Sequence, residues 1–318
     1  MTVAAAANAV SSDSAAIANA ALSDTPEVNP ASSDAASGKA ATSVAAGLDL
    51  GATLSKVVIR ASSAAEHDFE SFLLPAHADD AIRDFLAKRG VEAVGVTGAG
   101  ASRFLARLDG DLRTSHVSEF DAWGGGERTL LRTADFVPTK PHLLVSVGTG
   151  TSILKVDADG NVSRVGGTAL GGGTLRGLGL LLSGEADHDR LADLARRGSR
   201  HNVDLLVADL YPGGDISIAG DLTAANFGKV ESRTPEDLVK ALTRLVAENV
   251  GLLAGALASA HGKGLDVVYA GTTLRQHEEL KDILAFSTSL MGARGRFLPR
   301  GEFCGAVGAL EALETLGS

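Results

Sequence analysis

Hydrophobic and polar residues alternate along this chain in two patterns, one typical of strands and one typical of helices. Residues 44–60 place apolar positions on both sides of a short polar turn, and β-branched residues follow the turn. This pattern predicts a strand, a tight turn and a second strand. Two further strands and one amphipathic helix are predicted next, at residues 69–74, 91–97 and 79–89. Two more helices follow, the second interrupted or preceded by three glycines, at residues 102–108 and 117–131.

The same order of elements returns in the second half of the chain. Residues 142–147 form a near-continuous apolar stretch, and a Gly/Thr turn at 148–152 separates it from a partner strand at 153–156. Later segments predict helices at residues 188–197, 203–210, 234–260 and 280–290, strands at 266–270 and 296–298, and a last helix from Gly305. Because a hairpin with a Gly/Thr turn opens each half, we expect two α/β lobes with ligand loops at strand ends and a cleft between them.

The composition of the chain sets the expected domain boundaries. Residues 1–43 are mostly Ala, Ser, Asp, Asn and Pro, and such a segment cannot bury enough apolar area to offset the entropy of ordering it. It also lacks the basic start and compact apolar centre of a signal peptide. We therefore expect a disordered Ala/Ser-rich tail at 1–43, an N-terminal lobe at 44–140 and a C-terminal lobe at 141–318.

Composition also excludes several classes of partner. The 318 residues are 45% hydrophobic and 21% charged, which is enough for two domains with a core each. The net charge of -10 and the lack of a Lys/Arg cluster argue against nucleic acid or an anionic membrane surface. No run of residues reads as long and apolar enough to span a bilayer. Cys304 is the single cysteine, so an intrachain disulfide and a cysteine zinc site are excluded, and a cytoplasmic location is expected.

Glycine is concentrated between Arg164 and Gly184, where Gly166-Gly167 and Gly171-Gly172-Gly173 precede an apolar run. A glycine inside a helix costs about 1 kcal/mol relative to alanine, so three in a row predict a loop that turns sharply or lets a ligand approach the main chain. A glycine loop that leads into a helix N-terminus is an anion site, because free N–H groups and the helix dipole point at it. The alternative is a glycine-rich turn without a ligand.

A second candidate for phosphate binding is the turn that holds Asp49, Gly51, Thr53 and Lys56. In phosphoryl transfer an acid orients hydrated Mg²⁺, turn N–H groups and a hydroxyl hold phosphate oxygens, and a cation offsets their charge. Alone, the motif is more typical of an ordinary hairpin turn. A Gly-x-Gly turn at residues 148–150 repeats the device in the second half, and three such turns at strand or helix ends are much less expected by chance than one.

Together these motifs resemble the superfamily of actin, heat-shock chaperone ATPases and sugar kinases, and more narrowly the type II pantothenate kinases. The resemblance covers nearly everything from Gly47 to Leu310. It is carried, in the family's order, by the strings GLDLGATLSKVVIR, SEFDAWGGGERTLL, LLVSVGTGTSILKV, RVGGTALGGGTLRGLGLLLSG, LYPGGD, NFGKV and FCGAVGAL. It implies an α/β fold of two ribonuclease H-like, actin-like ATPase lobes with a central nucleotide cleft. It also implies ATP-dependent phosphorylation of the pantothenate 4′-hydroxyl, the first step of coenzyme A biosynthesis.

The resemblance places the catalytic base at Glu119, in the string SEFDAW. A carboxylate beside the hydroxyl accepts its proton as the P–O bond forms, an effect of roughly 10²–10⁴ in rate. The alternatives are a helix-surface glutamate without a role and the neighbouring acids Asp121 and Glu127 as the base.

The binding residues are also implied by the resemblance. The ATP phosphates and Mg²⁺ are expected against turn residues, with Asp49 holding the metal through water: Asp49, Gly51, Thr53, Lys56, Thr149, Gly171, Gly172, Gly173, Thr174 and Leu175. The adenosine side uses Thr272 and His188, although a histidine at a helix start is more often simply exposed. Ser152 and Arg164 match positions that line the pantothenate or acyl-CoA site, where an arginine fork suits a carboxylate. A strand-end surface charge is an equal alternative for Arg164.

Two other functions are compatible with the same fold. One is a sugar or amino-sugar kinase, which usually has an aspartate as its base, so Glu119 favours pantothenate. The other is an ATP-gated interaction protein of the actin or chaperone type, against which Glu119 and Arg164 in a small cleft would argue. We expect a homodimer through the helix at 234–260 or its neighbours. Coenzyme A and its thioesters are candidate regulators, and no residue in the sequence decides whether they act here.

Overall fold

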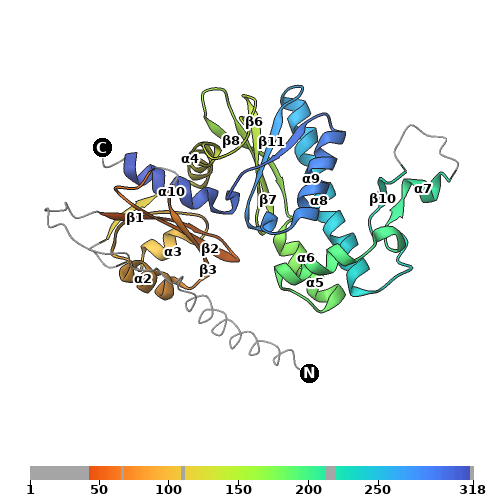
Figure 1. The fold of residues 1–318 in the computed structure, drawn as a ribbon, viewed down its shortest axis with the longest axis horizontal. Helices are drawn as coiled ribbons and strands as arrows, with labels where there is room; N and C mark the ends of the chain where they lie inside the picture. Colours follow the sequence, from red (N-terminus) through yellow and green to blue (C-terminus); the bar gives the residue numbers. More distant parts are fainter. Residues whose placement is uncertain (1–42, 66–67, 109–111, 213–219, 316–318) are drawn as a thin grey trace, which may run out of the picture. The chain divides into compact units, whose positions relative to one another are not determined.

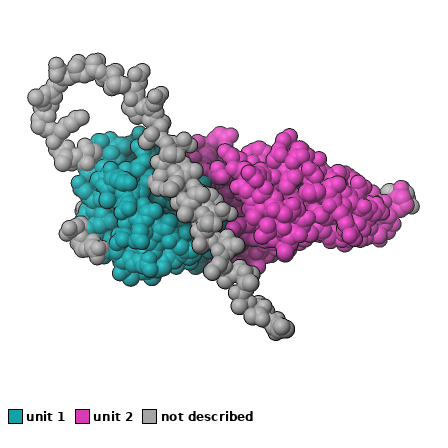
Figure 2. Space-filling view, turned by 90° about the horizontal axis from the view of Figure 1, so that it is seen from below, with its two compact units in different colours: residues 1–122, 305–318 teal, residues 123–304 magenta. Residues whose placement is uncertain are grey.

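The structure is a computed structural model that describes residues 43–65, 68–108, 112–212 and 220–315. The tail predicted at 1–43 lies outside the described residues apart from Ser43. Contacts divide the chain into two compact units: unit 1 is Met1–Ala122 with Gly305–Ser318, and unit 2 is Trp123–Cys304 (Figure 2). These units differ from the predicted lobes, because the first division falls inside a helix and almost all of the last helix belongs to unit 1.

Unit 1 is built on a five-stranded mixed sheet in the order β3-β2-β1-β4-β5 (Figure 1). Its strands are β1 (Val44–Leu50), β2 (Leu54–Ala61), β3 (Glu70–Pro75), β4 (Val91–Thr97) and β5 (Arg113–His116). The first three strands pair antiparallel, whereas β1, β4 and β5 pair in parallel. The central strands β1 and β4 are nearly continuous apolar runs, as expected for strands that are covered on both faces.

Helices cover the unit 1 sheet. They are α2 (Asp79–Lys88), α3 (Ala101–Leu105) and α10 (Cys304–Thr315), and the first turn of α4 (Glu119–Leu131) packs against α10. The predicted face of α2 is confirmed, since Ile82, Phe85 and Leu86 are buried in the core and Gly90 follows the helix with φ +64.

The last helix lies directly on the two central strands of unit 1. A Cβ atom built on Gly47 of β1 would lie 1.9 Å from the Ala306 carbonyl oxygen. One built on Gly95 of β4 would lie 1.9 Å from the Ala309 carbonyl oxygen. These two glycines therefore allow the backbone of α10 to approach the sheet, which is a common reason for glycine inside a strand.

Unit 2 repeats the topology of unit 1. Its sheet has the order β12-β11-β6-β7-β8, which is the order of unit 1 taken from the other edge. An antiparallel set of three is formed by β6 (His142–Val147), β7 (Thr151–Val156) and β8 (Val162–Thr168). Two strands continue from β6 in parallel, β11 (Asp266–Ala270) and β12 (Arg294–Phe297). The internal repeat predicted from the sequence is therefore seen as the same strand order and pairing in both sheets.

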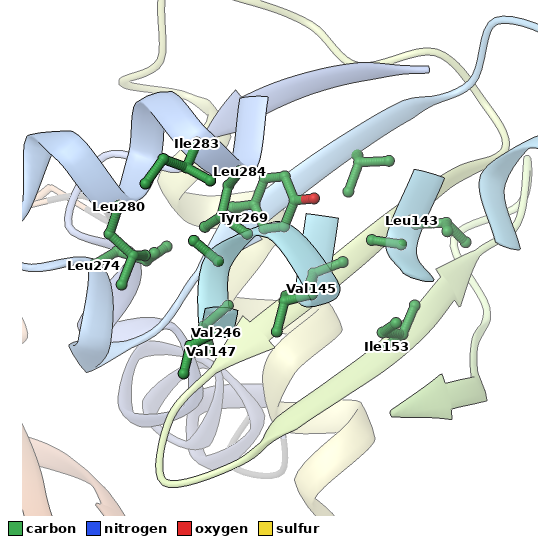
Figure 3. Packing of buried hydrophobic residues seen from close by; sticks show 14 of the residues in the cluster. Leu143, Val145, Val147, Ile153, Val246, Tyr269, Leu274, Leu280, Ile283 and Leu284 are labelled. Atoms are coloured by element: carbon green, nitrogen blue, oxygen red, sulfur yellow. The ribbon is translucent and has the colours of Figure 1, made fainter. Parts of the chain in front are cut away.

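The core of unit 2 lies between this sheet and the helices α8 (Pro235–His261) and α9 (Glu278–Leu290). Figure 3 shows how side chains of the two helices meet those of the strands, among them Val145, Val246, Tyr269 and Leu284. The Tyr269 hydroxyl, which is fully buried, lies 2.5 Å from Thr288 Oγ1 of α9. Aliphatic packing and one satisfied hydroxyl therefore join the helices to the sheet.

The long helix α8 begins as the sequence predicts. Thr234 is its N-cap and accepts a hydrogen bond from the Asp237 N–H, and Pro235 occupies the first helical position. Contrary to expectation, α8 is long and apolar enough, by length and composition, to cross a membrane, and it is the one helix of the described residues that is so. However, 67% of its apolar window is buried inside the protein, which is typical of the core helix of a soluble protein.

Unit 2 contains further helices and strands besides these sheet strands and core helices. They are α5 (Gly172–Ser183), α6 (His188–Arg197), η1 (Arg200–Asn202), β9 (Leu205–Leu206), α7 (Val207–Leu210), β10 (Thr223–Ala225), η2 (Thr272–Leu274) and η3 (Gly301–Phe303). The helix predicted at 203–210 is wrong over its first half, because β9 pairs with β10 there and α7 is a single turn. Tertiary packing accounts for this: Val203 is fully buried against Leu238 and Ala241 of α8.

Candidate active site

The turn between β1 and β2 brings four predicted residues to one end of the unit 1 sheet. Asp49 and Lys56 are directly opposite each other in the register, and Lys56 Nζ lies 3.2 Å from Asp49 Oδ2. The Gly51 N–H donates to the Leu54 carbonyl at 3.2 Å and closes the turn. Asp49 is only 5% exposed, whereas Thr53 at the tip is exposed. A buried carboxylate and an exposed hydroxyl therefore sit on the same short turn.

Two glycines that the sequence did not identify as site residues crowd the carboxylate of Asp49. A Cβ atom on Gly98 would lie 2.7 Å from Oδ1, and one on Gly305 would lie 3.0 Å from Oδ2. Gly98 also has φ +88, a conformation that favours glycine. Their closeness to Asp49 depends on the pairing of β4 with β1 and on the return of α10, so no local sequence pattern could have shown it.

Glu119 begins α4, and its surroundings raise its pKa. Ser118 caps the helix, since its Oγ accepts from the Asp121 N–H at 3.2 Å. Glu119 as a residue is exposed, but protein atoms crowd its carboxyl, and this desolvation raises the pKa of Glu119 above its ordinary value. The negative charge of Asp49 raises the pKa further, and Lys56 opposes the shift. Such a carboxylate is suited to accept a proton nearer neutral pH.

The two rival acids are engaged elsewhere. Asp121 Oδ2 accepts from the Ser118 hydroxyl at 2.6 Å, which belongs to the helix cap. Glu127 is 1% exposed, and its Oε1 lies 2.9 Å from His142 Nε2. Glu119, in contrast, has no hydrogen bond or ion pair to any residue that the structure describes. Of the three acids, Glu119 is therefore the exposed residue whose carboxyl has no hydrogen-bond or ion-pair partner among the described residues.

The second phosphate-type turn joins β6 to β7 in unit 2 and packs against the start of α5. The Gly172 N–H donates to the Gly148 carbonyl at 2.8 Å, and the Gly173 N–H donates to the Thr149 carbonyl at 2.9 Å. A Cβ atom on Gly171 would lie 2.8 Å from the oxygens of both carbonyls. The three consecutive glycines are thus required because the first turn of α5 touches this hairpin turn.

This packing uses N–H groups at the start of the glycine-rich helix α5. Free N–H groups at the start of α5 were expected to face an anion, but those of Gly172 and Gly173 already donate to the hairpin turn. Leu175 is buried in the core, and its N–H donates to the Gly171 carbonyl at 3.0 Å. Thr174 Oγ1 donates to a carbonyl within its own loop. The accessible part of this region is the hairpin turn itself, with Thr149 exposed and the α5 dipole behind it.

Ser152 and Arg164 lie on the neighbouring strands β7 and β8, and the structure brings them together. A Cβ atom built on Gly167, which is opposite Ser152 in the register, would lie 2.8 Å from Arg164 Nη2 and 3.6 Å from Ser152 Cα. Arg164 is exposed and forms no hydrogen bond or ion pair with the residues that the structure describes. An accessible, unengaged guanidinium beside a serine is suited to bind a carboxylate.

The two residues predicted for the adenosine side lie close to the segment that follows β11. Thr272 begins η2, and His188 begins α6. His188 is half-buried rather than simply exposed, and its Nε2 donates to the Arg275 carbonyl at 3.0 Å. His188 therefore links α6 to this segment through one of its ring nitrogens.

A cavity of about 460 Å³ lies at the carboxyl ends of β11 and β12. Its lining mixes aromatic, apolar and charged side chains, including Tyr269, Leu274, Arg275, Phe297, Arg300 and Glu302. Ligands in α/β sheets commonly bind outside the carboxyl ends of the strands. The position and the mixed lining of this cavity suit a flat, partly polar ligand such as a nucleobase.

Sequence reasoning did not identify two residues of the segment that follows β11. Thr273 Oγ1 donates to the Gly148 carbonyl at 2.9 Å and so ties the segment after β11 to that turn. His277 is 3% exposed, and its ring centre lies 5.8 Å from that of His188. Burial, followed by the repulsion of His188, lowers the pKa of His277 to about 4. Thr273 directly follows the predicted Thr272, whereas no local pattern marks a buried histidine.

A metal ion would find one suitable carboxylate in unit 1. Among the described residues, no group of three or more His, Cys, Asp and Glu side chains could hold a metal by itself. Mg²⁺ in phosphoryl-transfer sites is instead held through one or two carboxylates together with substrate phosphates and waters. The buried, oriented carboxylate of Asp49 at a strand end fits that requirement.

Solved structures identify the class to which this fold belongs. The activator of the 2-hydroxyisocaproyl-CoA dehydratase from Clostridium difficile, solved with ADPNP, has a TM-score of 0.58 and 18% identity over 86% of this chain and 95% of that chain. Component A of the (R)-2-hydroxyglutaryl-CoA dehydratase from Acidaminococcus fermentans has a TM-score of 0.56 and 17% identity, over 86% and 99%. With the repeated sheet topology, these structures define an actin-like ATPase fold, as predicted.

The chain belongs to the Fumble family, whose model matches residues 66–312. The type II pantothenate kinase of Oceanobacillus iheyensis is 37% identical over 218 residues, which are 68% of this chain and 80% of that protein. The type II pantothenate kinase of Staphylococcus aureus strain USA300 is 32% identical over 269 residues, 83% of this chain and 97% of that protein. The resemblance predicted from the motifs is therefore confirmed.

Proposed function

We propose that this chain is a type II pantothenate kinase, which uses ATP to phosphorylate the 4′-hydroxyl of pantothenate in the first step of coenzyme A biosynthesis. The observation that carries the proposal is the 32% identity to the Staphylococcus aureus enzyme, which extends over 83% of this chain. The match to the Fumble family over residues 66–312 supports it. So does the carboxyl of Glu119, which has no hydrogen-bond or ion-pair partner among the described residues and interacts electrostatically with the Asp49–Lys56 turn.

In this proposal Glu119 is the general base. Its carboxylate takes the proton of the 4′-hydroxyl as that oxygen forms its bond to the γ-phosphorus, while the bond from the γ-phosphorus to the leaving oxygen of ADP breaks. The raised pKa and the lack of a competing partner favour this role. The Ser118 cap fixes the start of α4 and with it the position of Glu119.

We assign the ATP phosphates to two hairpin turns. In unit 1 the turn at residues 51–56 offers its backbone, the Thr53 hydroxyl and the Lys56 ammonium. In unit 2 the turn at 148–151 offers its backbone and the exposed Thr149. The Gly171–Gly173 segment, whose N–H groups are partly used in packing, supports the second turn rather than providing most of its donors. Leu175 anchors the start of α5 in the core.

Mg²⁺ would be held by Asp49 through water. When bound, the ion neutralises the charge that develops on the phosphate oxygens. The contribution of the chain is a carboxylate with a fixed orientation, since Lys56 pairs with it and Gly98 leaves room for Oδ1. On the same proposal, the adenosine moiety uses Thr272 and the cavity beside it, with His188 supporting the segment after β11.

Three further properties are proposals that accompany the activity: a cytoplasmic location, a homodimer, and regulation by coenzyme A or its thioesters. The dimer has structural support, because the helices that pack against α8 carry exposed apolar side chains, namely Leu178, Leu180 and Leu181 on α5 and Phe286 and Leu290 on α9. Such side chains are typical of surfaces that another protein covers.

The experiment that tests the proposal measures ADP release by the purified full-length chain with ATP and Mg²⁺. Pantothenate, glucose and N-acetylglucosamine are compared as acceptors, and products are identified by mass spectrometry. We expect ADP release that depends on pantothenate and a product heavier by one phosphoryl group. Turnover with a sugar alone would identify a sugar kinase. ATP hydrolysis that no acceptor stimulates would indicate an ATP-gated interaction protein.

A further inference from the structure

We infer that Gly167 is a positioning residue for the substrate carboxylate, because its missing side chain makes the space in which the guanidinium of Arg164 lies. The inference rests on the proposed function, since it takes the carboxylate of pantothenate as the anion that Arg164 binds. It assigns a role to one more residue, because a glycine three positions after the arginine sets the geometry of the carboxylate site.

An irregularity in strand pairing places Arg164 and Gly167 on the same face of the sheet. Arg164 is opposite Leu154 and Gly167 is opposite Ser152, so three steps along β8 span two steps along β7. Residues opposite each other share a face, as do residues two apart on one strand. Strict alternation would have put Arg164 and Gly167 on opposite faces. An extra residue of this kind commonly redirects a side chain next to a binding site.

The space beside Gly167 is filled by the arginine and by backbone. A Cβ atom there would lie 2.8 Å from Arg164 Nη2 and 2.6 Å from the Thr151 carbonyl oxygen. Gly167 does not have a positive φ, so its backbone conformation alone does not call for glycine. A methyl group at this position has to displace the guanidinium and also to move away from the Thr151 carbonyl of the neighbouring strand. Since Arg164 has no other partner among the described residues, nothing else would hold its fork beside Ser152.

The neighbouring glycine has a different environment and provides a matched control. Gly166 is opposite Ile153, on the face of β8 that α8 covers. A Cβ atom on Gly166 would lie 2.7 Å from Leu257 Cδ1, the end of a flexible side chain. Gly166→Ala therefore changes the packing of α8 on the same strand without adding an atom beside Arg164.

The test compares Gly167→Ala, Gly166→Ala, Arg164→Ala and the double variant Arg164→Ala/Gly167→Ala in the full-length chain. Pantothenate affinity is measured by calorimetry, and KM and kcat are measured for pantothenate and for ATP. For Gly167→Ala we expect Kd and KM for pantothenate to rise about tenfold, the effect of losing a charge-assisted fork worth about 1.4 kcal/mol. For the same variant, the KM for ATP should change less than about twofold. The control Gly166→Ala should also change pantothenate affinity less than about twofold, a difference of about 0.4 kcal/mol in binding free energy.

The double variant separates an effect through the arginine from a general distortion. If Gly167 acts by positioning Arg164, adding Gly167→Ala to Arg164→Ala should change pantothenate affinity less than about twofold, because the two residues act as one unit. Unchanged affinity in Gly167→Ala, or an equal loss when Arg164 is already absent, would overturn the inference. If Gly167→Ala does not fold, recovery of folding in the double variant supports the inference, and failure of both variants overturns it.

Failure of the proposed function has a separate result. A wild-type chain that neither binds nor phosphorylates pantothenate contradicts the proposed function, and the assignment of Arg164 is lost with it. A wild-type chain that phosphorylates pantothenate while Gly167→Ala binds it normally contradicts only the inference about Gly167.

Discussion

At the scale of single residues, the proposed activity depends on the ionisation of one carboxyl group. Glu119 can accept a proton only when it is ionised. Desolvation and the charge of Asp49 raise the pKa of Glu119 above its ordinary value of 4.5. The ionised fraction therefore declines at a higher pH than it would for an exposed glutamate. We expect kcat/KM for pantothenate to fall as the pH is lowered through this raised pKa, in a plot of rate against pH.

Removal of the carboxylate tests this role directly. We expect Glu119→Gln to lower kcat by roughly 10²–10⁴ while ATP affinity stays nearly unchanged, because the base acts only on the hydroxyl proton. The matched control is Asp121→Asn, two positions along the same helix, where the carboxylate accepts from the Ser118 hydroxyl. That variant should retain most of its rate. Normal turnover in Glu119→Gln, or a larger loss in Asp121→Asn, would assign the base elsewhere.

The same substitution has a predictable effect on stability. A carboxyl with a raised pKa in the folded state contributes stability below its unfolded pKa and loses that contribution as the pH rises through the folded pKa. At pH 7 the ionised Glu119 is therefore less favourable to folding than a neutral glutamine. Thermal unfolding should show Glu119→Gln to be at least as stable as the wild type at pH 7. An inactive but more stable variant would separate catalysis from folding.

Sequence reasoning could predict which candidate site residues lie close together only where that closeness is local. Asp49, Thr53 and Lys56 occupy one short hairpin, so the order of the chain alone brings them together. Glycine density predicted at Gly171–Gly173 a loop that turns sharply or lets a ligand approach the main chain. In the structure, Gly172 and Gly173 begin α5, and their N–H groups donate to a turn of the protein itself. This reasoning could not predict that Gly98 lies beside Asp49, because the two residues are distant in sequence and only strand pairing brings them together.

At the scale of elements, a buried histidine links α6, η2 and α9 and makes the stability of unit 2 depend on pH. His277 precedes α9 and contacts the ring of His188 at the start of α6. Its pKa is lowered to about 4, so the folded state holds it neutral while the unfolded state binds a proton near pH 6.5. Stability is therefore lost as the pH falls from about 6.5 towards 4, by up to about 3 kcal/mol.

The variant His277→Phe should remove that part of the pH dependence, since phenylalanine fills a similar volume and cannot be protonated. Urea unfolding of both proteins at several pH values between 4 and 7 measures the difference. Carboxyl groups with raised pKa values, such as Glu119 and Asp204, act in both proteins and cancel. Substitution of the exposed His261 is the control and should leave the slope unchanged. Parallel stability curves for wild type and His277→Phe would contradict the prediction.

The elements that were predicted well are those with a chemical boundary. Thr234 and Pro235 fixed the start of α8 to the residue. The helix at 203–210 failed over its first half because Val203 packs against α8 and Leu205 and Leu206 pair with β10. The glycines in α4 were expected to interrupt or precede a helix, yet α4 is continuous from Glu119 to Leu131. Gly124 has a packing role there, since a Cβ atom on it would lie 2.4 Å from Val162 Cγ2 of β8.

At the scale of the whole molecule, one topology is used twice, and the chain does not divide where its sequence repeats. The repeat was visible in the two hairpins that open the halves of the chain, and the resemblance of the motifs implied the fold class, whereas the order of strands in each sheet was not predicted. The boundaries could not be predicted, because the last helix returns to the sheet of unit 1. The last helix is placed there by complementary packing between residues far apart in sequence. Gly47 and Gly95 have no side chains, so the backbone of α10 can lie directly on their strands.

Because α10 packs on the unit 1 sheet, one added methyl group at this contact is predicted to destabilise unit 1. A Cβ atom on Gly95 would lie 1.9 Å from the Ala309 carbonyl oxygen, and neither backbone can move far inside the sheet or the helix. We expect Gly95→Ala to destabilise the protein by about 1–3 kcal/mol, the usual cost of overpacking a core. The measurement is the free energy of unfolding in urea, with limited proteolysis to show that unit 1 opens first.

The control for this prediction is Gly177→Ala, on the exposed side of α5, where nothing lies within 4 Å of an added Cβ atom. Alanine there should stabilise the protein by up to about 1 kcal/mol, because only the entropy of the unfolded chain and helix propensity change. Since Gly305, beside the carboxylate of Asp49, follows the first residue of α10, loosening this helix should also weaken ATP binding. If Gly95→Ala is as stable as the wild type, then α10 does not hold unit 1 together through this contact.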